Sequence, residues 1–216
     1  EKLVSVPYRW SHGATDDHLG DGLIIYSLIQ FMRAKICVCL GSGGGFIPRI
    51  MTQARLDLHS QKIFDGTRDI NWGDIGTTFV VDATNGVGGN VNWMNEESFF
   101  RRVYSPRILN TTTEDAFYNF FVKQEIKIDY LHIDAGHSYE NVKEDFELYT
   151  QLLSPNGIVS IHDTDPNYAD KFIVTQEVKD RGDHDDWTGP IKFSQEIDTN
   201  VWEKINLFNH GMPEVL

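Results

Sequence analysis

Apolar residues along the chain gather in short runs that alternate between the spacing typical of strands and that typical of helices. Compact β-rich runs, bounded by glycine, proline or acidic residues, predict buried strands. They lie at residues 34–40, 77–82, 107–110, 128–134 and 158–162. Between them, stretches with apolar residues three or four apart predict helices. These cover 21–34, which is apolar nearly all round and so predicted to be buried, 46–60, 114–124 and 138–153, with two more near 96–103 and after about 168.

The last part of the chain carries a different pattern. Residues 191–197 and 201–208 read as two strands, and Asp198–Asn200 between them reads as a hairpin-like turn. Strands that alternate with helices imply a parallel sheet covered by helices on both faces. We therefore predict an α/β fold with a doubly wound, mostly parallel sheet of seven strands, and a C-terminal hairpin that pairs antiparallel at one edge.

The domain organisation follows from the absence of repeats and linkers in the sequence. A chain of 216 residues suits one α/β domain, which we expect to span 1–216. The polar residues 1–20 form an N-terminal arm or a lid over the site. Residues 61–76 carry clustered turn signals and are predicted to be an insertion.

Composition narrows the range of functions. Lys and Arg number 19 against 32 Asp and Glu, a formal charge of −13, which disfavours binding to nucleic acid. No stretch approaches the ~20 apolar residues of a transmembrane helix, so no membrane partner is expected. Cys37 and Cys39 lie two apart on one predicted strand and cannot bridge each other. This is a reduced, intracellular pattern, and we expect a cytoplasmic protein.

Polar residues follow the predicted strands, and in parallel sheets ligands sit outside the carboxyl ends of the strands. Five polar loops are therefore expected to converge along one rim of the sheet. They are Gly41–Gly45, Asp82, the 110–115 loop, Asp134–His137 and His162–Asp165.

A glycine-rich turn connects the first strand to the next helix. Its glycines allow a ligand to approach the backbone closely, and the helix N-terminus favours negative charge. The dinucleotide fingerprint needs glycine or alanine at its sixth position, where this chain has Phe46. The glycine–x–glycine–x–glycine pattern instead resembles the S-adenosylmethionine loop of class I methyltransferases, which have a Rossmann-like fold. The resemblance implies that Gly41, Ser42, Gly43 and Gly45 bind S-adenosylmethionine.

Acidic residues after the next two strands fit the same resemblance. A carboxylate at a strand end can accept hydrogen bonds from both ribose hydroxyls, and the family places one where Asp82 stands. Asp65 competes for this role but lies among turn signals. The resemblance also places an acid near the adenine, at Glu114 or Asp115, although a favourable helix macrodipole explains these two equally well. The family usually has a further acid two residues before the first glycine, where this chain has Cys39.

The strongest local signature lies at the ends of the last two core strands. Asp134 ends one strand and His137 follows at the turn into a helix, in the segment 133–145. His162 and Asp163 end the neighbouring strand. Carboxylates and imidazoles gathered in this way can hold a divalent ion.

This pairing resembles the small O-methyltransferase group that includes macrocin-type sugar methyltransferases and cephalosporin-hydroxylase-like enzymes. The resemblance covers roughly residues 20–165 and implies metal ligation by Asp134, His162 and Asp163, with Mg²⁺ or another divalent cation. Asp134 would also border the cofactor. Without a metal, His137 or His162 would be the catalytic base. The implied substrate is a hydroxyl of a sugar or another polar small molecule, and the family admits a homodimer.

Two other functions stay open, and several residues have simpler interpretations. The chain could be an NAD-linked oxidoreductase, or a non-catalytic Rossmann-like ligand-binding module that kept the glycine loop. His137 could be a buried histidine that binds the turn, and His132 is best explained as a core residue. Among the remaining histidines, His12 receives no role on its own evidence. The acidic run 181–187 is interpreted as a solvated loop.

Overall fold

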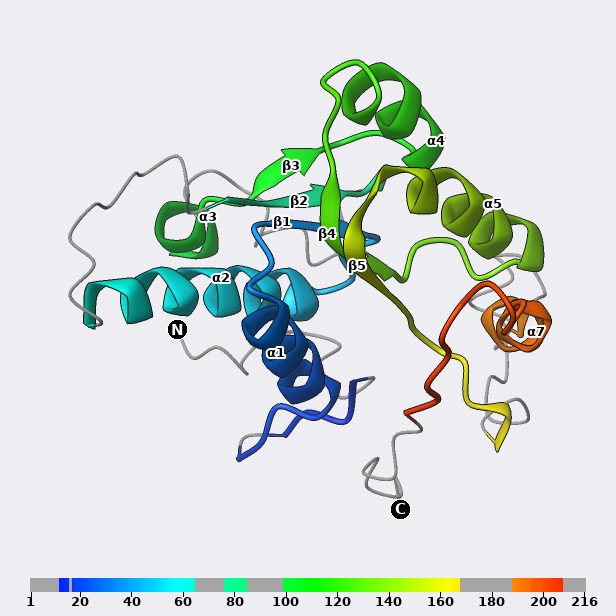
Figure 1. Ribbon diagram of the computed structural model, residues 1–216, viewed down its shortest axis with the longest axis horizontal. Helices are drawn as coiled ribbons and strands as arrows, with labels where there is room; N and C mark the ends of the chain where they lie inside the picture. Colours follow the sequence, from blue (N-terminus) through cyan, green and yellow to red (C-terminus); the bar gives the residue numbers. More distant parts are fainter. Residues whose placement is uncertain (1–11, 16, 65–75, 85–98, 168–187, 208–216) are drawn as a thin grey trace.

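A computed structural model describes residues 12–15, 17–64, 76–84, 99–167 and 188–207. Its centre is a sheet of five parallel strands in the order β3-β2-β1-β4-β5 (Figure 1). The strands are β1 (Ile36–Leu40), β2 (Thr77–Val81), β3 (Arg107–Leu109), β4 (Ile128–Ile133) and β5 (Leu153–Ile161). The reversal of order beside β1 is the point at which doubly wound sheets bind ligands.

Helices cover both faces of the sheet, as the alternating pattern predicts. One face carries α1 (Asp21–Met32), α2 (Phe46–Phe64) and α3 (Phe99–Tyr104). The other carries α4 (Thr113–Ala116), its π-helical continuation (Phe117–Phe121), α5 (Tyr139–Tyr149) with a 3₁₀ turn (Thr150–Leu152), and α7 (Gly189–Glu196).

Strand β1 shows why the core divides into two. Val38 and Leu40 pack with the apolar side chains of β4, α4 and α5, whereas Cys37 and Cys39 pack with α1 and α2. All four are fully or almost fully buried, because successive side chains of a strand point to opposite faces and both faces are covered. The two cysteines are free, as their spacing predicts.

The predicted seven strands and C-terminal hairpin are wrong within the described residues. Residues 191–197 fall in and just after helix α7, and 201–207 form no strand. Pro190 is tolerated in a first helical turn, where its missing N–H costs nothing. The helix then buries Ile191 and Phe193, and the Phe193 ring lies 5.2 Å from that of Phe146 on α5. Packing against α5 therefore decides the structure of this segment.

Two smaller predictions also need correction. Helix α1 is not buried all round: it buries Ile25 and Ile29 against the sheet, while Phe31 is 87% exposed. Residues 154–157, which the sequence places between a helix and the strand 158–162, lie inside β5, where the pairing with β4 shifts register. The extra residues are accommodated as an irregularity rather than as a strand end.

Some predicted segments lie outside the described residues. These are residues 1–11 and 16 of the N-terminal arm, 65–75 of the insertion, 168–187 with the start of the helix predicted after about 168, and the acidic run 181–187 within that range. Residues 61–64 of that insertion form the last turn of α2. In the described part of the chain, no helix is both long and apolar enough to cross a membrane.

Candidate active site

The backbone aligns four of the predicted site residues along the carboxyl rim of the sheet. Gly41, Asp82, Asp134 and His162 each follow directly after a strand. Each donates its N–H to the carbonyl of the last residue of a neighbouring strand, at 2.9 to 3.1 Å. The parallel ladder therefore continues one residue beyond the strands and fixes where these four residues stand.

The glycine loop between β1 and α2 is held close to the end of β4. Gly41 has a φ of 77°, and a Cβ there would overlap the carbonyl oxygen of Asp134. Gly43 also has a positive φ, of 47°, but the space around its Cα is open. The first glycine is thus required by the neighbouring backbone, and the second leaves room for a ligand.

Asp82 lies at the end of β2, as predicted, and its buried carboxylate organises the glycine loop. The Ser42 N–H donates to Oδ2 at 3.0 Å, and the Ser42 hydroxyl donates to the same oxygen. The Thr84 N–H and hydroxyl donate to Oδ1 at 2.9 and 3.1 Å. Both carboxylate oxygens of Asp82 therefore already accept hydrogen bonds within the protein.

Glu114 and Asp115 are exposed on the short helix α4. Thr112 caps this helix and accepts a hydrogen bond from the Asp115 N–H at 3.2 Å. The Asp115 carboxylate accepts hydrogen bonds from Thr111 and Asn119, each at 3.2 Å. These local bonds fit the interpretation of Asp115 as an acid at a helix N-terminus.

The ends of β4 and β5 bring together the four predicted acidic and imidazole side chains. His137 Nε2 lies 3.2 Å from Asp163 Oδ2 and 3.6 Å from Asp134 Oδ1. His162 Nδ1 lies 3.1 Å from Asp163 Oδ1 and 3.4 Å from Asp134 Oδ1. Asp163 adopts a φ of 55°, an unfavourable value for a residue with a side chain, and such outliers gather at functional sites. We call these four residues the acid–imidazole cluster.

Opposite charges dominate the electrostatics of this cluster. Burial lowers the pKa of His137, but its contacts with Asp134 and Asp163 outweigh burial and raise that pKa to about 9. Burial also lowers the pKa of His162, but the carboxylates of Asp163 and Asp134 outweigh burial and hold that pKa well above its ordinary value. Burial raises the pKa of both aspartates, but the imidazoles outweigh it and lower both below their usual range. The cluster therefore favours two imidazolium and two carboxylate groups.

The structure adds two residues that the sequence did not assign to the site. The His12 ring is 4.4 Å from the His162 ring, and Asp21 Oδ2 is 3.8 Å from His162 Nε2. Burial, and secondarily the charge on His162, lowers the pKa of His12 to about 3, so its imidazole is neutral. No local signal could have found either one, since Asp21 reads as an ordinary first-turn acid of α1. His132 is a buried residue, as predicted, with Nδ1 2.8 Å from Ser160 Oγ.

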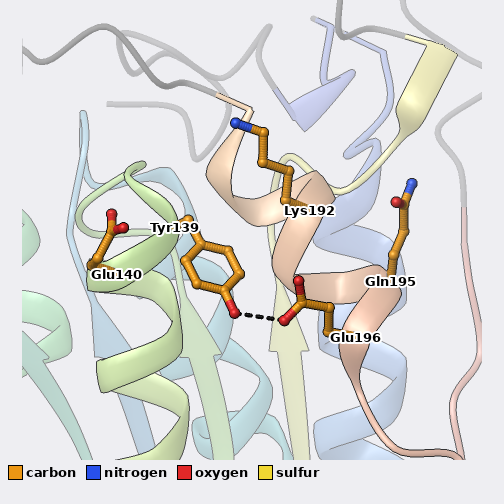
Figure 2. Close-up of a pocket in the computed structure, with 5 residues that line it drawn as sticks. All are labelled: Tyr139, Glu140, Lys192, Gln195 and Glu196. Atoms are coloured by element: carbon orange, nitrogen blue, oxygen red, sulfur yellow. Dashed lines mark hydrogen bonds between the residues drawn. The ribbon is translucent and has the colours of Figure 1, made fainter.

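A recess of about 430 Å³ lies between α5 and α7 (Figure 2). It is lined by Tyr139, Glu140, Lys192, Gln195 and Glu196. The Tyr139 hydroxyl donates to Glu196 Oε2 at 2.5 Å across the recess. Tyr139 begins α5 two residues after His137, so the recess adjoins the acid–imidazole cluster along the chain but contains none of its members.

The parallel strand order, the glycine loop after β1 and the acidic rim define a protein of the class I methyltransferase fold. Residues 38–164 match a family model described as a methyltransferase domain. This match covers more than half of the chain, and the chain belongs to that family. Its class is that of the S-adenosylmethionine-dependent methyltransferases, as the glycine loop predicted, rather than that of the NAD-linked oxidoreductases.

Similar proteins agree at the level of the fold. An O-methyltransferase from Bacillus cereus, solved with S-adenosylhomocysteine, superposes with a TM-score of 0.54 at 14% identity, over 86% of this chain and 70% of that one. The O-methyltransferase TomG from Streptomyces achromogenes, involved in tomaymycin synthesis and solved with S-adenosylmethionine, gives 0.55 at 13% identity, over 90% and 77%.

One curated relative is more similar in sequence. The uncharacterized protein y4gI of Sinorhizobium fredii (strain NBRC 101917 / NGR234) is 33% identical over 174 residues. The alignment covers 76% of this chain but 17% of that protein, so this chain spans about a sixth of its relative.

Proposed function

We propose that this protein transfers a methyl group from S-adenosylmethionine to a hydroxyl of a sugar or another polar small molecule, with the help of a divalent cation. The observation that carries this proposal is the acid–imidazole cluster beside the glycine loop. Methyl transfer needs a bound donor, an aligned acceptor oxygen and a destination for the acceptor's proton. The cluster supplies groups for the last two needs.

The donor would lie across the ends of β1 and β2. Gly41, Ser42, Gly43 and Gly45 would cradle it, and Asp82 would accept hydrogen bonds from the ribose hydroxyls. Asp82 would then exchange part of its bonding to Ser42 and Thr84 for bonding to the ribose. Glu114 or Asp115 would lie toward the adenine, because α4 follows the next strand along the rim.

The reaction itself is a displacement at the methyl carbon. The acceptor oxygen forms a bond to that carbon, the carbon–sulfur bond breaks, and the electron pair stays on sulfur, which becomes a neutral thioether. The hydroxyl proton passes to a base, which contributes roughly 10²–10⁴-fold. His137 is the candidate when His162 holds the cation, and without a cation His162 is a second candidate. Either imidazole takes the proton only when it is itself neutral. A cation bound to the paired carboxylates would neutralise their charge, and the imidazole would then more readily lose its proton and become neutral.

The donor atoms present fit a divalent cation. One ligand atom each from Asp134, His162 and Asp163 lies within 4.8 Å of the others. Two carboxylates and one imidazole suit Mg²⁺ or Mn²⁺ better than a soft metal. Held there, such an ion would polarise the acceptor hydroxyl and lower its pKa.

The recess between α5 and α7 supports a polar acceptor. Tyr139, Lys192, Gln195 and Glu196 offer both donors and acceptors of hydrogen bonds, which is what recognition of several hydroxyls requires.

Thermal unfolding of the purified chain tests the proposal, with S-adenosylhomocysteine, NAD or neither, each with and without Mg²⁺. A ligand at 100 times its dissociation constant stabilises by ~2.7 kcal/mol, which moves the midpoint by roughly 5–10 °C in a domain of this size. We expect a shift with S-adenosylhomocysteine and a further shift with Mg²⁺. A shift with NAD alone, or with nothing, would contradict the proposal, and the second result would favour a non-catalytic module.

A further inference from the structure

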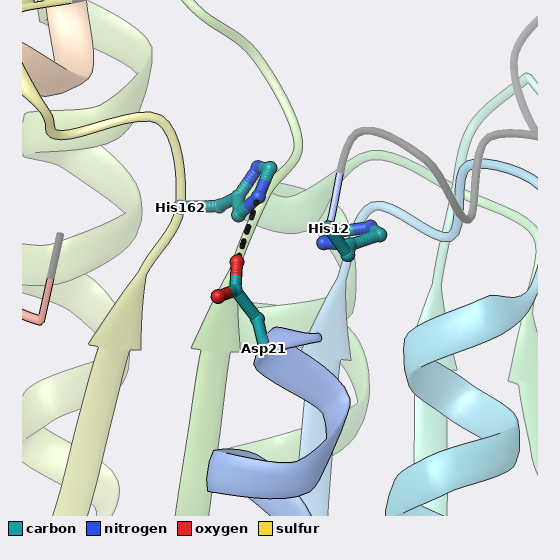
Figure 3. Close-up of side chains that lie close together, drawn as sticks. All are labelled: His12, Asp21 and His162. Carbon is teal, nitrogen blue, oxygen red and sulfur yellow. Dashed lines mark ion pairs between the residues drawn. The ribbon is translucent and has the colours of Figure 1, made fainter. Parts of the chain in front are cut away.

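We propose a second cation site, formed by His12, Asp21 and His162, that takes a transition-metal ion of the Zn²⁺ or Co²⁺ type. One ligand atom from each side chain lies within 4.8 Å of the other two. Figure 3 shows the Asp21 carboxylate pointing toward the His162 ring, and one ring nitrogen of His12 facing both. We call these three residues the histidine site.

Three separate parts of the chain build the histidine site. His12 comes from the residues before α1, Asp21 is the first residue of α1, and His162 follows β5. Zinc is bound at about 2.0–2.2 Å by nitrogen and oxygen, with its ligands arranged as a tetrahedron. The three ligand atoms lie within 4.8 Å of one another and would draw closer together around the ion.

The state of His12 points independently to a ligand. Its side chain is only 7% exposed, and Nδ1 has no hydrogen-bond partner among the residues that the structure describes. The ring lies against Phe46, with the centroids 5.6 Å apart and the planes 24° from parallel. A buried polar atom without a partner is costly, and coordination of an ion by His12 offsets that cost.

His162 faces the two sites with different ring nitrogens. Nε2 is the atom nearest Asp21, whereas Nδ1 faces Asp134 and Asp163. A histidine that binds a metal through one nitrogen usually presents the other to a carboxylate, which fixes the ring and raises its basicity. The acid–imidazole cluster therefore supplies the outer partners that the histidine site needs.

The donor sets of the two sites select different ions. Two imidazoles and one carboxylate favour Zn²⁺, Co²⁺ or a similar ion over Mg²⁺, which prefers oxygen donors. The pair of carboxylates at Asp134 and Asp163 has the opposite preference. The histidine site goes beyond the proposed methyl transfer, since binding there requires neither donor nor acceptor.

Titration of the full chain with Co²⁺ tests the histidine site without an activity assay. Co²⁺ in a site with four or five ligands absorbs visible light, and this absorption reports occupancy directly. We expect saturable absorption in the unmodified protein, and at least a tenfold loss of Co²⁺ affinity in both His12→Gln and Asp21→Asn. His18→Gln is the matched control, because His18 is an exposed histidine of the same segment, and its affinity should be unchanged.

Asp163→Asn separates the two sites. It removes one outer partner of His162 but leaves Asp134 facing Nδ1. The Co²⁺ absorption should therefore remain saturable, with a smaller loss of affinity than in His12→Gln or Asp21→Asn. The Mg²⁺-dependent shift in thermal midpoint should be lost. If Asp163→Asn removed the absorption while His12→Gln and Asp21→Asn kept it, the ion would belong to the acid–imidazole cluster and the histidine site would be refuted. Absence of absorption in the unmodified protein would refute it too, and neither result would bear on binding of S-adenosylhomocysteine. Circular dichroism without metal checks that each variant is folded. If His12→Gln does not fold, Asp21→Asn still tests the histidine site.

Discussion

The two halves of the rim hold their polar groups in opposite ways. Within the part of the chain that the structure describes, the Asp82 carboxylate accepts hydrogen bonds from uncharged groups, the N–H and hydroxyl groups of Ser42 and Thr84. Around Asp134 and Asp163, the partners are imidazoles that share the charge. The bonds of Asp82 hold the backbone of the glycine loop, whereas Asp134 and Asp163 lie close to the opposite charges of the imidazoles. The proposed proton transfer takes place in this second half. Substitutions in the first should therefore change stability and donor binding, and substitutions in the second should change turnover.

The largest effect is expected for Asp134→Asn. Loss of this carboxylate removes a cation ligand and a partner of both imidazoles, so turnover should fall by about 10²–10⁴-fold. Release of S-adenosylhomocysteine from S-adenosylmethionine, with an acceptor that supports turnover, measures the rate. Calorimetric affinity for S-adenosylhomocysteine should change less than threefold. A fully active variant would remove Asp134 from the chemistry.

Gly41→Ala should be the most destabilising change in the glycine loop. A positive φ and overlap with the Asp134 carbonyl act together, and we expect a loss of about 3–5 kcal/mol in the free energy of unfolding. Gly43→Ala is the matched control, with a positive φ but open space, and should cost about 1 kcal/mol. Urea denaturation measures both. Equal losses would show that the contact with β4 does not matter.

Asp145 on α5 sharpens the comparison because it is a buried carboxyl that no imidazole neutralises. Burial raises its pKa to about 7, against the 3.8 of an unfolded chain. Its contribution to stability is therefore complete below about pH 4 and is lost as the pH rises through about 7. Asp145→Asn should be more stable than the unmodified protein by about 2–3 kcal/mol at pH 8, and similar to it at pH 4. Urea midpoints across this range measure the difference, and parallel pH profiles would contradict it.

The smallest effect is expected for Asp82→Asn, which keeps one acceptor oxygen and the shape of the side chain. Affinity for S-adenosylhomocysteine should fall about tenfold, a loss of ~1.4 kcal/mol. Asp198→Asn, at an exposed turn far along the chain, provides the control and should leave the affinity unchanged. An affinity for the Asp82 variant equal to that of the control would place the ribose elsewhere.

The sequence predicted the part of the fold whose boundaries are marked by local residues, namely the core strands and the residues that follow them. Each core strand ends at a glycine or a polar residue, so the order of elements and the residues at the rim could be placed. Asp134, His137, His162 and Asp163 meet as predicted, because parallel strands deliver their ends to the same edge. Their roles as ligands and bases stay predictions.

What the sequence did not predict depends on packing between distant segments. The spacing of residues 191–197 fits a strand as well as a helix, and the contact of Phe193 with Phe146 decides for the helix. His12 stands in a polar segment with no periodicity, and only its approach to His162, 150 residues further on, gives it a setting. Periodicity reports only on residues that are close along the chain, whereas these two contacts join residues that are far apart in sequence.

The N–H groups that continue the ladder past the strand ends also fix the distances between the residues of the rim. Asp82, Gly41, Asp134 and His162 stand at the ends of four adjacent strands, about 4.8 Å apart, so the row spans about 14 Å. The backbone of the sheet thus sets the spacing of these four residues, and side-chain motion cannot change it. One residue inserted into β4 would move Asp134 off the row. If donor and acceptor bind along the row as proposed, that insertion would separate them.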